Sequence, residues 1–254
     1  MSGRRRIRLD DLIVERGLAP DRTAAQRLLL GGHVRVGEGD GARLDRKPGE
    51  EVYAATATAL VDRPRFVSRG GEKLDAALEA FGIEVSGRVC LDVGASTGGF
   101  TDVLLRRGAA RVYALDVGRG QLAEVLRRDP RVVSMERTHA ARLDPSSSDP
   151  VALPEKVGLA VIDVSFISLT RVLGAVKAAL SGDGEIVALV KPQFEADPAD
   201  APRGVVRDAA IQRAMVDRVA AHAAALGLQL RDQMESPLRG PAGNREFLVH
   251  LASA

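Results

Sequence analysis

The sequence predicts an α/β fold, in which a doubly wound, mostly parallel sheet of seven strands follows a small α+β module. Beyond residue 68, short apolar runs alternate with amphipathic segments, a pattern typical of parallel strands joined by helices. Earlier in the chain the elements are shorter and richer in arginine. We therefore expect a module at residues 1–60, a linker at 61–67 and a larger domain at 68–254.

The first module reads as two short helices and two short strands. An amphipathic stretch predicts a helix over residues 7–18, and Asp21 is a suitable N-cap for a second helix over 22–30. A pair of glycines then leads into a strand over 33–36, and a further strand is expected at 51–54.

The larger domain alternates strands and helices. The expected strands are 88–93, 111–116, 131–135, 158–163, 185–190, 228–234 and 246–251. The expected helices are 73–81, 100–107, 120–128, 170–180 and 208–226. Only a turn separates the last two strands, so they should pair antiparallel. The start of the last strand then lies at the edge where the other strands end.

The composition of the chain argues against a membrane, secreted, disulfide-bonded or metal-binding protein. No apolar run approaches the ~18 residues of a membrane span, and no signal peptide is evident, so we expect a cytoplasmic protein without a membrane partner. The single cysteine, Cys90, excludes an internal disulfide, and the four histidines lack ligand spacing, so no metal is expected. Residues 1–36 carry eight arginines against four acids, a local excess that suits a nucleic acid.

A glycine-rich turn after the first strand of the larger domain predicts a ligand pocket. Residues 89–101 read as a buried strand, a turn of small residues and the start of a helix, so backbone N–H groups can meet a ligand. The glycines are spaced GxxxGG, which fits the dinucleotide fingerprint poorly. Asp92 and Asp116 are acids that a pocket for S-adenosylmethionine needs. A purely structural turn is the alternative interpretation.

Two of the few lysines stand beside carboxylates at element ends. Only five of the thirty-six Lys and Arg residues are lysine. Asp163 and Lys191 end two strands, Glu246 starts the last strand, and Lys73 opens the helix before the first. Crowding and desolvation lower the pKa of a lysine toward that of a general base, whereas arginine keeps its proton. We expect these four residues at one sheet edge; separate surface ion pairs are the alternative.

Motifs spread over nearly the whole chain carry a family resemblance. They are residues 68–74, 91–102, 113–122, 163–169, 191–195, 204–208, 236–237 and 243–246. Together they resemble the TlyA family of rRNA 2′-O-methyltransferases, historically called hemolysins, with an FtsJ-like catalytic domain. The resemblance implies a Rossmann-like methyltransferase fold. It also matches Lys73, Asp163, Lys191 and Glu246 to the Lys-Asp-Lys-Glu tetrad of FtsJ-like enzymes.

The first module carries a second resemblance. The matching residues are Arg8-Leu-Asp, Val14-Glu-Arg-Gly-Leu, residues 21–23, Ala25-Gln-Arg-Leu-Leu and Gly32-His-Val-Arg-Val. This module is similar to an RNA-binding module first described in a small-subunit ribosomal protein, in which the second helix lies on folded RNA. The resemblance implies that Arg22 and Arg27 contact RNA; a solvated basic helix face is the alternative. Ribosomal RNA or a ribosomal subunit is then the partner, and no stable protein partner is evident.

The expected activity is S-adenosylmethionine-dependent methylation of a ribose 2′-hydroxyl in ribosomal RNA. The catalytic residues are the tetrad, in which Lys191 activates the hydroxyl. The cofactor site is assigned to Asp92, Gly94, Ser96, Gly98, Asp116 and Asp163. The segment after Asp163 lacks the proline pair that base methyltransferases place there.

Two other functions stay open. A membrane-active hemolysin would need a secretion signal or a strongly amphipathic free helix, which the sequence lacks. An RNA-binding protein with an inactive methyltransferase domain is disfavoured by the intact tetrad. The chain departs from the family at His139 and Ala141, where the family usually has Asn and Arg, and again over residues 196–203. The resemblance therefore does not specify the contacts to adenine.

Overall fold

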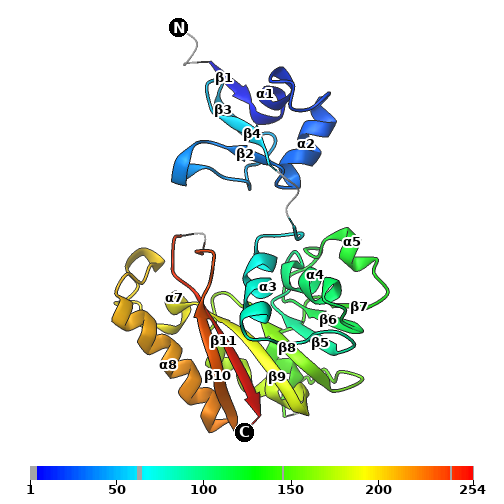
Figure 1. The fold of residues 1–254 in the computed structure, drawn as a ribbon, viewed down its shortest axis with the longest axis vertical. Coiled ribbons are helices and arrows are strands. Elements are labelled where there is room, and N and C mark those ends of the chain that lie inside the picture. Colours follow the sequence, from blue (N-terminus) through cyan, green and yellow to red (C-terminus); the bar gives the residue numbers. More distant parts are fainter. Residues whose placement is uncertain (1–4, 62–64, 145, 241, 254) are drawn as a thin grey trace. The chain divides into compact units, whose positions relative to one another are not determined.

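The computed structural model describes residues 5–61, 65–144, 146–240 and 242–253, and the chain divides into two units, Met1–Arg65 and Phe66–Ala254 (Figure 1). The linker expected at 61–67 spans the boundary, and its residues 62–64 lie outside the described residues. Each unit has a hydrophobic core of its own.

The first unit packs two helices against two small sheets. The helices are α1 (Leu9–Glu15) and α2 (Arg22–Leu30); the antiparallel pairs are β1 (Arg6–Arg8) with β3 (Glu51–Tyr53) and β2 (Val34–Val36) with β4 (Thr58–Leu60). Leu9, Ile13 and Val34 are fully buried. Asp21 caps α2 as predicted, accepting the Ala24 N–H at 2.7 Å.

One prediction for this unit was wrong, and one strand was not predicted. The helix predicted over 7–18 is shorter, because β1 pairs with β3 before it and Gly17, at φ 69°, follows its end. The strand β4 was not predicted. Strands of three residues offer too little alternation to be recognised without their partners.

The second unit contains the predicted seven-stranded, mostly parallel sheet. Its strands are β5 (Val89–Val93), β6 (Arg111–Leu115), β7 (Val132–Met135), β8 (Val157–Ile162), β9 (Leu180–Val190), β10 (Leu228–Glu235) and β11 (Phe247–Ser253), in the order β10-β11-β9-β8-β5-β6-β7. β11 runs antiparallel to both β9 and β10, which confirms the expected direction of the last strand.

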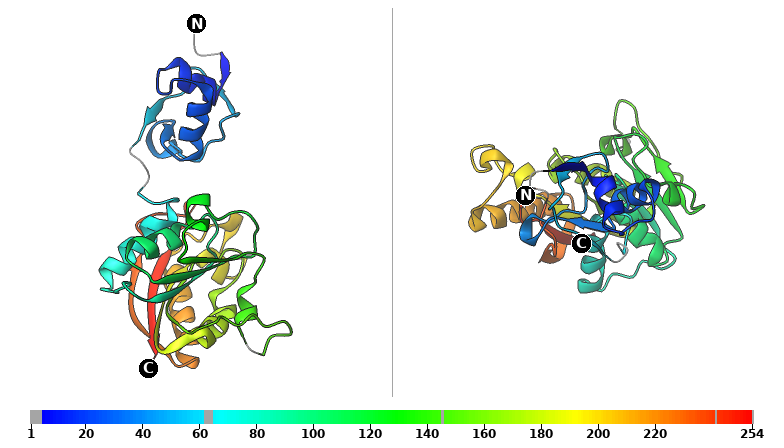
Figure 2. Two further views of the ribbon diagram at one scale, coloured as in Figure 1. Left: turned by 90° about the vertical axis from the view of Figure 1, so that its right-hand side faces the viewer. Right: turned by 90° about the horizontal axis from the view of Figure 1, so that it is seen from above.

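Helices cover both faces of this sheet (Figures 1 and 2). They are α3 (Gly70–Ala80), α4 (Gly99–Arg106), α5 (Glu124–Arg127), α6 (Leu173–Ala179), α7 (Pro192–Glu195) and α8 (Ala209–Ala225). Buried side chains of α3, α4 and α5 pack in one hydrophobic cluster with the sheet, and those of α6 and α8 pack in a second. The sheet is therefore doubly wound, and its central strands β5, β8 and β9 are largely buried.

Helix boundaries differ from prediction where long-range contacts intervene. The helix expected over 120–128 contains only the four residues of α5, because preceding N–H groups bond elsewhere: Gly120 donates to Glu136 Oε1 at 2.7 Å and Ala123 to the Thr97 carbonyl at 3.1 Å. The helix expected over 170–180 is a 3₁₀ turn followed by α6, and Leu180 already belongs to β9.

Among the described residues, no helix is both long and apolar enough to cross a membrane. Nor do the described ranges contain a group of three or more His, Cys, Asp or Glu side chains arranged to hold a metal ion.

Candidate active site

The glycine turn between β5 and α4 packs tightly against its neighbours at the carboxyl edge of the sheet. Gly94 has φ +85°, and a Cβ atom there would lie 2.3 Å from the Asp163 carbonyl oxygen. Gly98 has φ +96°, and a Cβ atom there would meet Leu126 of α5 at 2.2 Å. Glycine is therefore required at both positions. Gly98 holds the turn against α5 and is not among the residues that line the two cavities described next.

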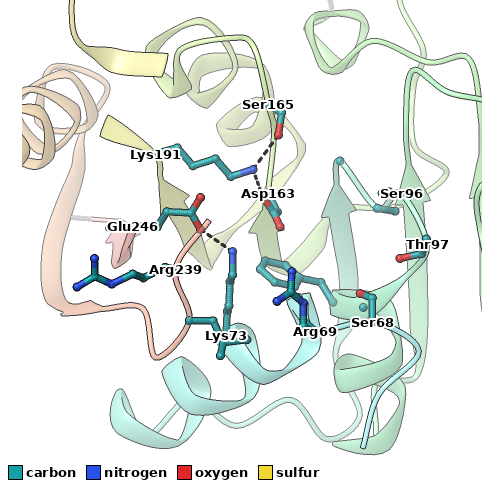
Figure 3. A pocket seen from close by; sticks show the side chains of 16 residues that line it. Ser68, Arg69, Lys73, Ser96, Thr97, Asp163, Ser165, Lys191, Arg239 and Glu246 are labelled. Atoms are coloured by element: carbon teal, nitrogen blue, oxygen red, sulfur yellow. Dashed lines mark hydrogen bonds and ion pairs between the residues drawn. The ribbon is translucent and has the colours of Figure 1, made fainter. Parts of the chain in front are cut away.

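Two adjoining cavities open at this edge of the sheet. The first, of about 300 Å³, lies between the start of α3, the glycine turn and the segment before β11 (Figure 3). The second, of about 570 Å³, extends from the same turn past the end of β6. Gly94, Ser96, Asp163 and Ser165 line both cavities, which together form one elongated site for a small molecule.

Asp116 lines the second cavity and fixes the glycine turn. Its Oδ2 atom accepts the Ser96 N–H at 2.8 Å, and its Oδ1 atom accepts the Gly118 N–H at 2.6 Å. A carboxylate has about four acceptor positions, so these two bonds leave capacity for hydroxyl donors from a ligand.

Asp92 lies beneath the turn, outside the lining of both cavities. It is fully buried in β5, and its Oδ2 atom accepts the Thr101 hydroxyl at 2.6 Å. Burial raises the pKa of Asp92 to about 7, although the Thr101 hydrogen bond opposes this shift. Its Oδ1 atom has no hydrogen-bond partner among the described residues. Asp92 therefore joins β5 to α4 below the ligand site.

The four residues expected at the sheet edge lie together as two ion pairs (Figure 3). Lys73 Nζ is 2.5 Å from Glu246 Oε2, and Lys191 Nζ is 2.6 Å from Asp163 Oδ1. All four line the first cavity. Glu246 is only 1% exposed and Lys191 9%. The cluster is therefore mostly buried and balanced in charge, with Asp163 its most exposed member at 23% of its side chain.

The antiparallel last strand explains why Glu246 reaches this cluster. Phe247 pairs with Val190, which places Glu246 beside Lys191 at the end of β9. Gly240 lies directly against the carboxylate, since a Cβ atom there would be 2.5 Å from Glu246 Oε1. Lys73 lies one turn inside α3 instead of opening it, because this helix begins three residues earlier than predicted.

Three side chains near Lys191, those of Ser165, Phe166 and Phe194, were not predicted to belong to the site. Lys191 Nζ donates a hydrogen bond to Ser165 Oγ at 2.9 Å, and it lies 6.0 Å from the centre of the Phe194 ring. The Phe166 ring is 5.1 Å from that of Phe194, is 90% exposed and lies on backbone of φ +65°. The signal available in the sequence was an aromatic residue just after a predicted strand end, in a chain with 3% aromatic residues.

The two arginines assigned to RNA belong to the first unit. Arg22 and Arg27 are both exposed on α2, near its two ends. Arg22 forms an ion pair with Asp11 at 2.5 Å, whereas Arg27 has no ion-pair partner among the described residues. The charge available to an RNA phosphate is therefore larger at Arg27.

Comparison with known proteins agrees with this geometry. The FtsJ-like methyltransferase model matches residues 66–253, and the S4 domain model matches residues 7–38. The 16S/23S rRNA (cytidine-2′-O)-methyltransferase TlyA of Mycobacterium tuberculosis is 50% identical over 250 residues, covering 97% of this chain and 90% of that protein. Hemolysin A of Brachyspira hyodysenteriae is 37% identical over 246 residues, covering 96% and 99%.

A solved structure shows the same arrangement. A hemolysin-type protein from Streptococcus thermophilus is 41% identical and matches with a TM-score of 0.74 over 100% of this chain and 90% of that chain. The family resemblance found in the sequence is thereby confirmed.

Proposed function

The chain belongs to the FtsJ-like methyltransferase family, and we propose that it uses S-adenosylmethionine to methylate a ribose 2′-hydroxyl of ribosomal RNA. The observation that carries this proposal is the two lysine–carboxylate ion pairs, each with one buried member, beside the glycine turn. The S4 domain and the relative named as an rRNA methyltransferase support an RNA substrate. Such a substrate places the enzyme in the cytoplasm, with the ribosomes.

The residues of the two cavities fit S-adenosylmethionine. Apolar Leu115, Val117 and Ile167 line the second cavity beside the Asp116 carboxylate, which suits an adenosine. Gly94 and Ser96 line both cavities and leave backbone exposed where the methionine part would pass. When bound, S-adenosylmethionine supplies an electrophilic methyl group. Asp116 would accept hydrogen bonds from its ribose hydroxyls.

Lys191 is the residue proposed to take the proton of the ribose hydroxyl at its Nζ atom, in its unprotonated form. Asp163 and Ser165 hold that atom, at 2.6 Å and 2.9 Å. Lys73 and Glu246 face the same cavity as a pair and position the hydroxyl. Because the methyl group is already reactive, most of the acceleration comes from alignment by these fixed side chains.

Phe166 is proposed to receive the base of the target nucleotide. It lines the second cavity, next to the catalytic cluster, and its ring is almost fully exposed. Aromatic rings in such positions stack on bases that have been turned out of a helix. The positive φ of Phe166 indicates a backbone held in an unfavourable conformation, as is common at functional sites.

The test is methyl transfer to ribosomal subunits isolated from cells that lack this protein. With labelled S-adenosylmethionine, we expect label in the RNA and one or more new positions that resist alkaline cleavage, because a 2′-O-methyl group removes the attacking hydroxyl. Label recovered on a base, or no transfer to either subunit, would contradict the proposal.

A further inference from the structure

A third cavity near the catalytic cluster is lined by arginines. It has a volume of about 420 Å³ and is lined by residues 205–207, Gln212, Arg239, 242, 243 and Arg245. Three of these residues are arginine and none is acidic. Arg239 also lines the first catalytic cavity, so the two cavities meet at this side chain. Figure 3 shows the Arg239 guanidinium directed away from Asp163.

Buried polar side chains hold the wall of this arginine cavity in place. Gln212 is 3% exposed, and its Nε2 atom donates to the Val206 carbonyl at 2.8 Å. Asn244 is also 3% exposed; it accepts the Val206 N–H at 3.1 Å and donates to the Gly204 carbonyl at 2.8 Å. The segment that carries Arg207 is therefore fixed by three hydrogen bonds.

Two of the three guanidinium groups are uncompensated. Arg207 and Arg239 have neither an ion pair nor a side-chain hydrogen bond within the described ranges of the chain. Arg245 pairs with Glu235 at 2.8 Å. The neighbouring Asp208 forms no ion pair with Arg207 among the described residues; its carboxylate accepts the Ala210 N–H at 2.7 Å, at the start of α8. The cavity therefore presents a net positive charge on a fixed frame.

We propose that the arginine cavity binds a backbone phosphate of the RNA strand that carries the target nucleotide. This inference rests on the proposed function. The guanidinium fork matches the oxygens of a phosphate, and planar arginines are favoured for that contact. The catalytic tetrad is balanced in charge and offers little attraction to the strand. A strand that places a ribose in the first cavity therefore continues past Arg239 and gives a neighbouring phosphate to Arg207.

The same frame connects phosphate binding to the catalytic cluster. The Asn244 carbonyl accepts the Gly240 N–H at 2.9 Å, and Gly240 lies against the Glu246 carboxylate. Asn244 thus joins the wall of the arginine cavity to the segment that confines Glu246. A phosphate bound in the arginine cavity would therefore also stabilise the position of the segment beside Glu246.

The experiment measures the binding of full-length protein to ribosomal subunits from cells that lack it, over a series of salt concentrations. Arg207→Gln with Arg239→Gln should weaken binding about tenfold or more, as expected for lost hydrogen bonds to a charged group. The slope of log affinity against log salt should also fall by about 0.7 to 0.9 for each lost phosphate contact. Arg245→Gln should have a smaller effect, because its charge is already paired.

The matched control is Arg231→Gln, an exposed arginine of β10 that bonds the Ser253 carbonyl at the opposite end of the hairpin. It should keep the wild-type slope. Arg207→Gln alone, whose side chain lines neither of the first two cavities, should keep wild-type affinity for S-adenosylmethionine, which verifies its fold. A double variant with the wild-type slope and affinity would overturn this inference alone, provided that the wild-type protein methylates the RNA. Loss of cofactor binding in Arg207→Gln would also count against it, because the arginine cavity would then be structural.

Discussion

The paired charges of the second unit and the exposed charges of the first unit have different physical effects. Around Lys191 each charge has a partner within 2.6 Å, and the four side chains are between 1% and 23% exposed. On α2, by contrast, Arg22 and Arg27 are both exposed, and Arg22 forms an ion pair with a single acid, Asp11, among the described residues. Paired and buried charges fix the position of reacting atoms, whereas exposed charges attract a polyanion over a distance. Substitutions in the two places should therefore change different measured quantities.

The largest effect is expected at Lys191. Lys191→Ala and Lys191→Arg should both lower the rate of methyl transfer on the order of 10²-fold or more, since neither side chain can take the hydroxyl proton. The measurement is single-turnover transfer to ribosomal subunits. Lys156→Arg, a lysine remote from the cavities described above, is the matched control and should keep the wild-type rate. If Lys191→Arg retained most of the activity, the lysine would act as a fixed charge and the proton-acceptor role would be wrong.

A second, smaller effect separates cofactor binding from catalysis. Asp116→Ala should raise the dissociation constant of S-adenosylmethionine roughly tenfold or more, about 1.4 kcal/mol, because it removes the carboxylate proposed to bind the ribose. Calorimetric titration measures this change. Asp144→Ala is the comparison, since the Asp144 carboxylate already bonds Ser146 and lies outside both cavities. If the two variants bound the cofactor with similar affinity, a residue other than Asp116 would bind the ribose.

On α2 the expected change is in RNA affinity and not in rate. Arg27→Gln should weaken binding to ribosomal subunits by a few-fold and reduce the salt slope by about 0.9, as for one lost phosphate contact. Arg22→Gln should do less, because Asp11 already compensates its charge. The maximal rate at saturating RNA should stay unchanged for both. An identical effect of the two substitutions would show that the Asp11 pair opens when RNA binds.

A change in stability, and not in rate or affinity, is expected at Asp92, a buried carboxylate that has no ion pair among the described residues. Its folded-state pKa of about 7 lies above its ordinary value of 3.8, so its stabilising contribution is complete below the ordinary value and is lost as pH rises through 7. Asp92→Asn stays neutral and can still accept the Thr101 hydroxyl. The variant should therefore gain stability relative to wild type between pH 5 and pH 8, as measured by urea unfolding. A difference independent of pH would contradict this.

The sequence predicted those parts of the molecule that depend on local pattern. The apolar runs predicted the seven strands of the sheet. The short turn before β11 predicted its antiparallel direction, which places Glu246 beside Lys191. The shortness of α5 could not be predicted, because it depends on a hydrogen bond from Gly120 to Glu136 on another element. Arg207 and Arg239 were likewise missed: they stand on irregular segments far apart in sequence, and only the folded hairpin brings them to one cavity.

The ion pair between Lys73 and Glu246 joins residues 173 positions apart, the first on α3 and the second at the start of the last strand of the sheet. The second cavity is lined only by residues between Val93 and Val172, so its lining is synthesised well before Glu246. The catalytic cluster closes only when the final hairpin docks on β9, and contacts of such long range form late in folding. The catalytic cluster is therefore the last part of the site to be completed.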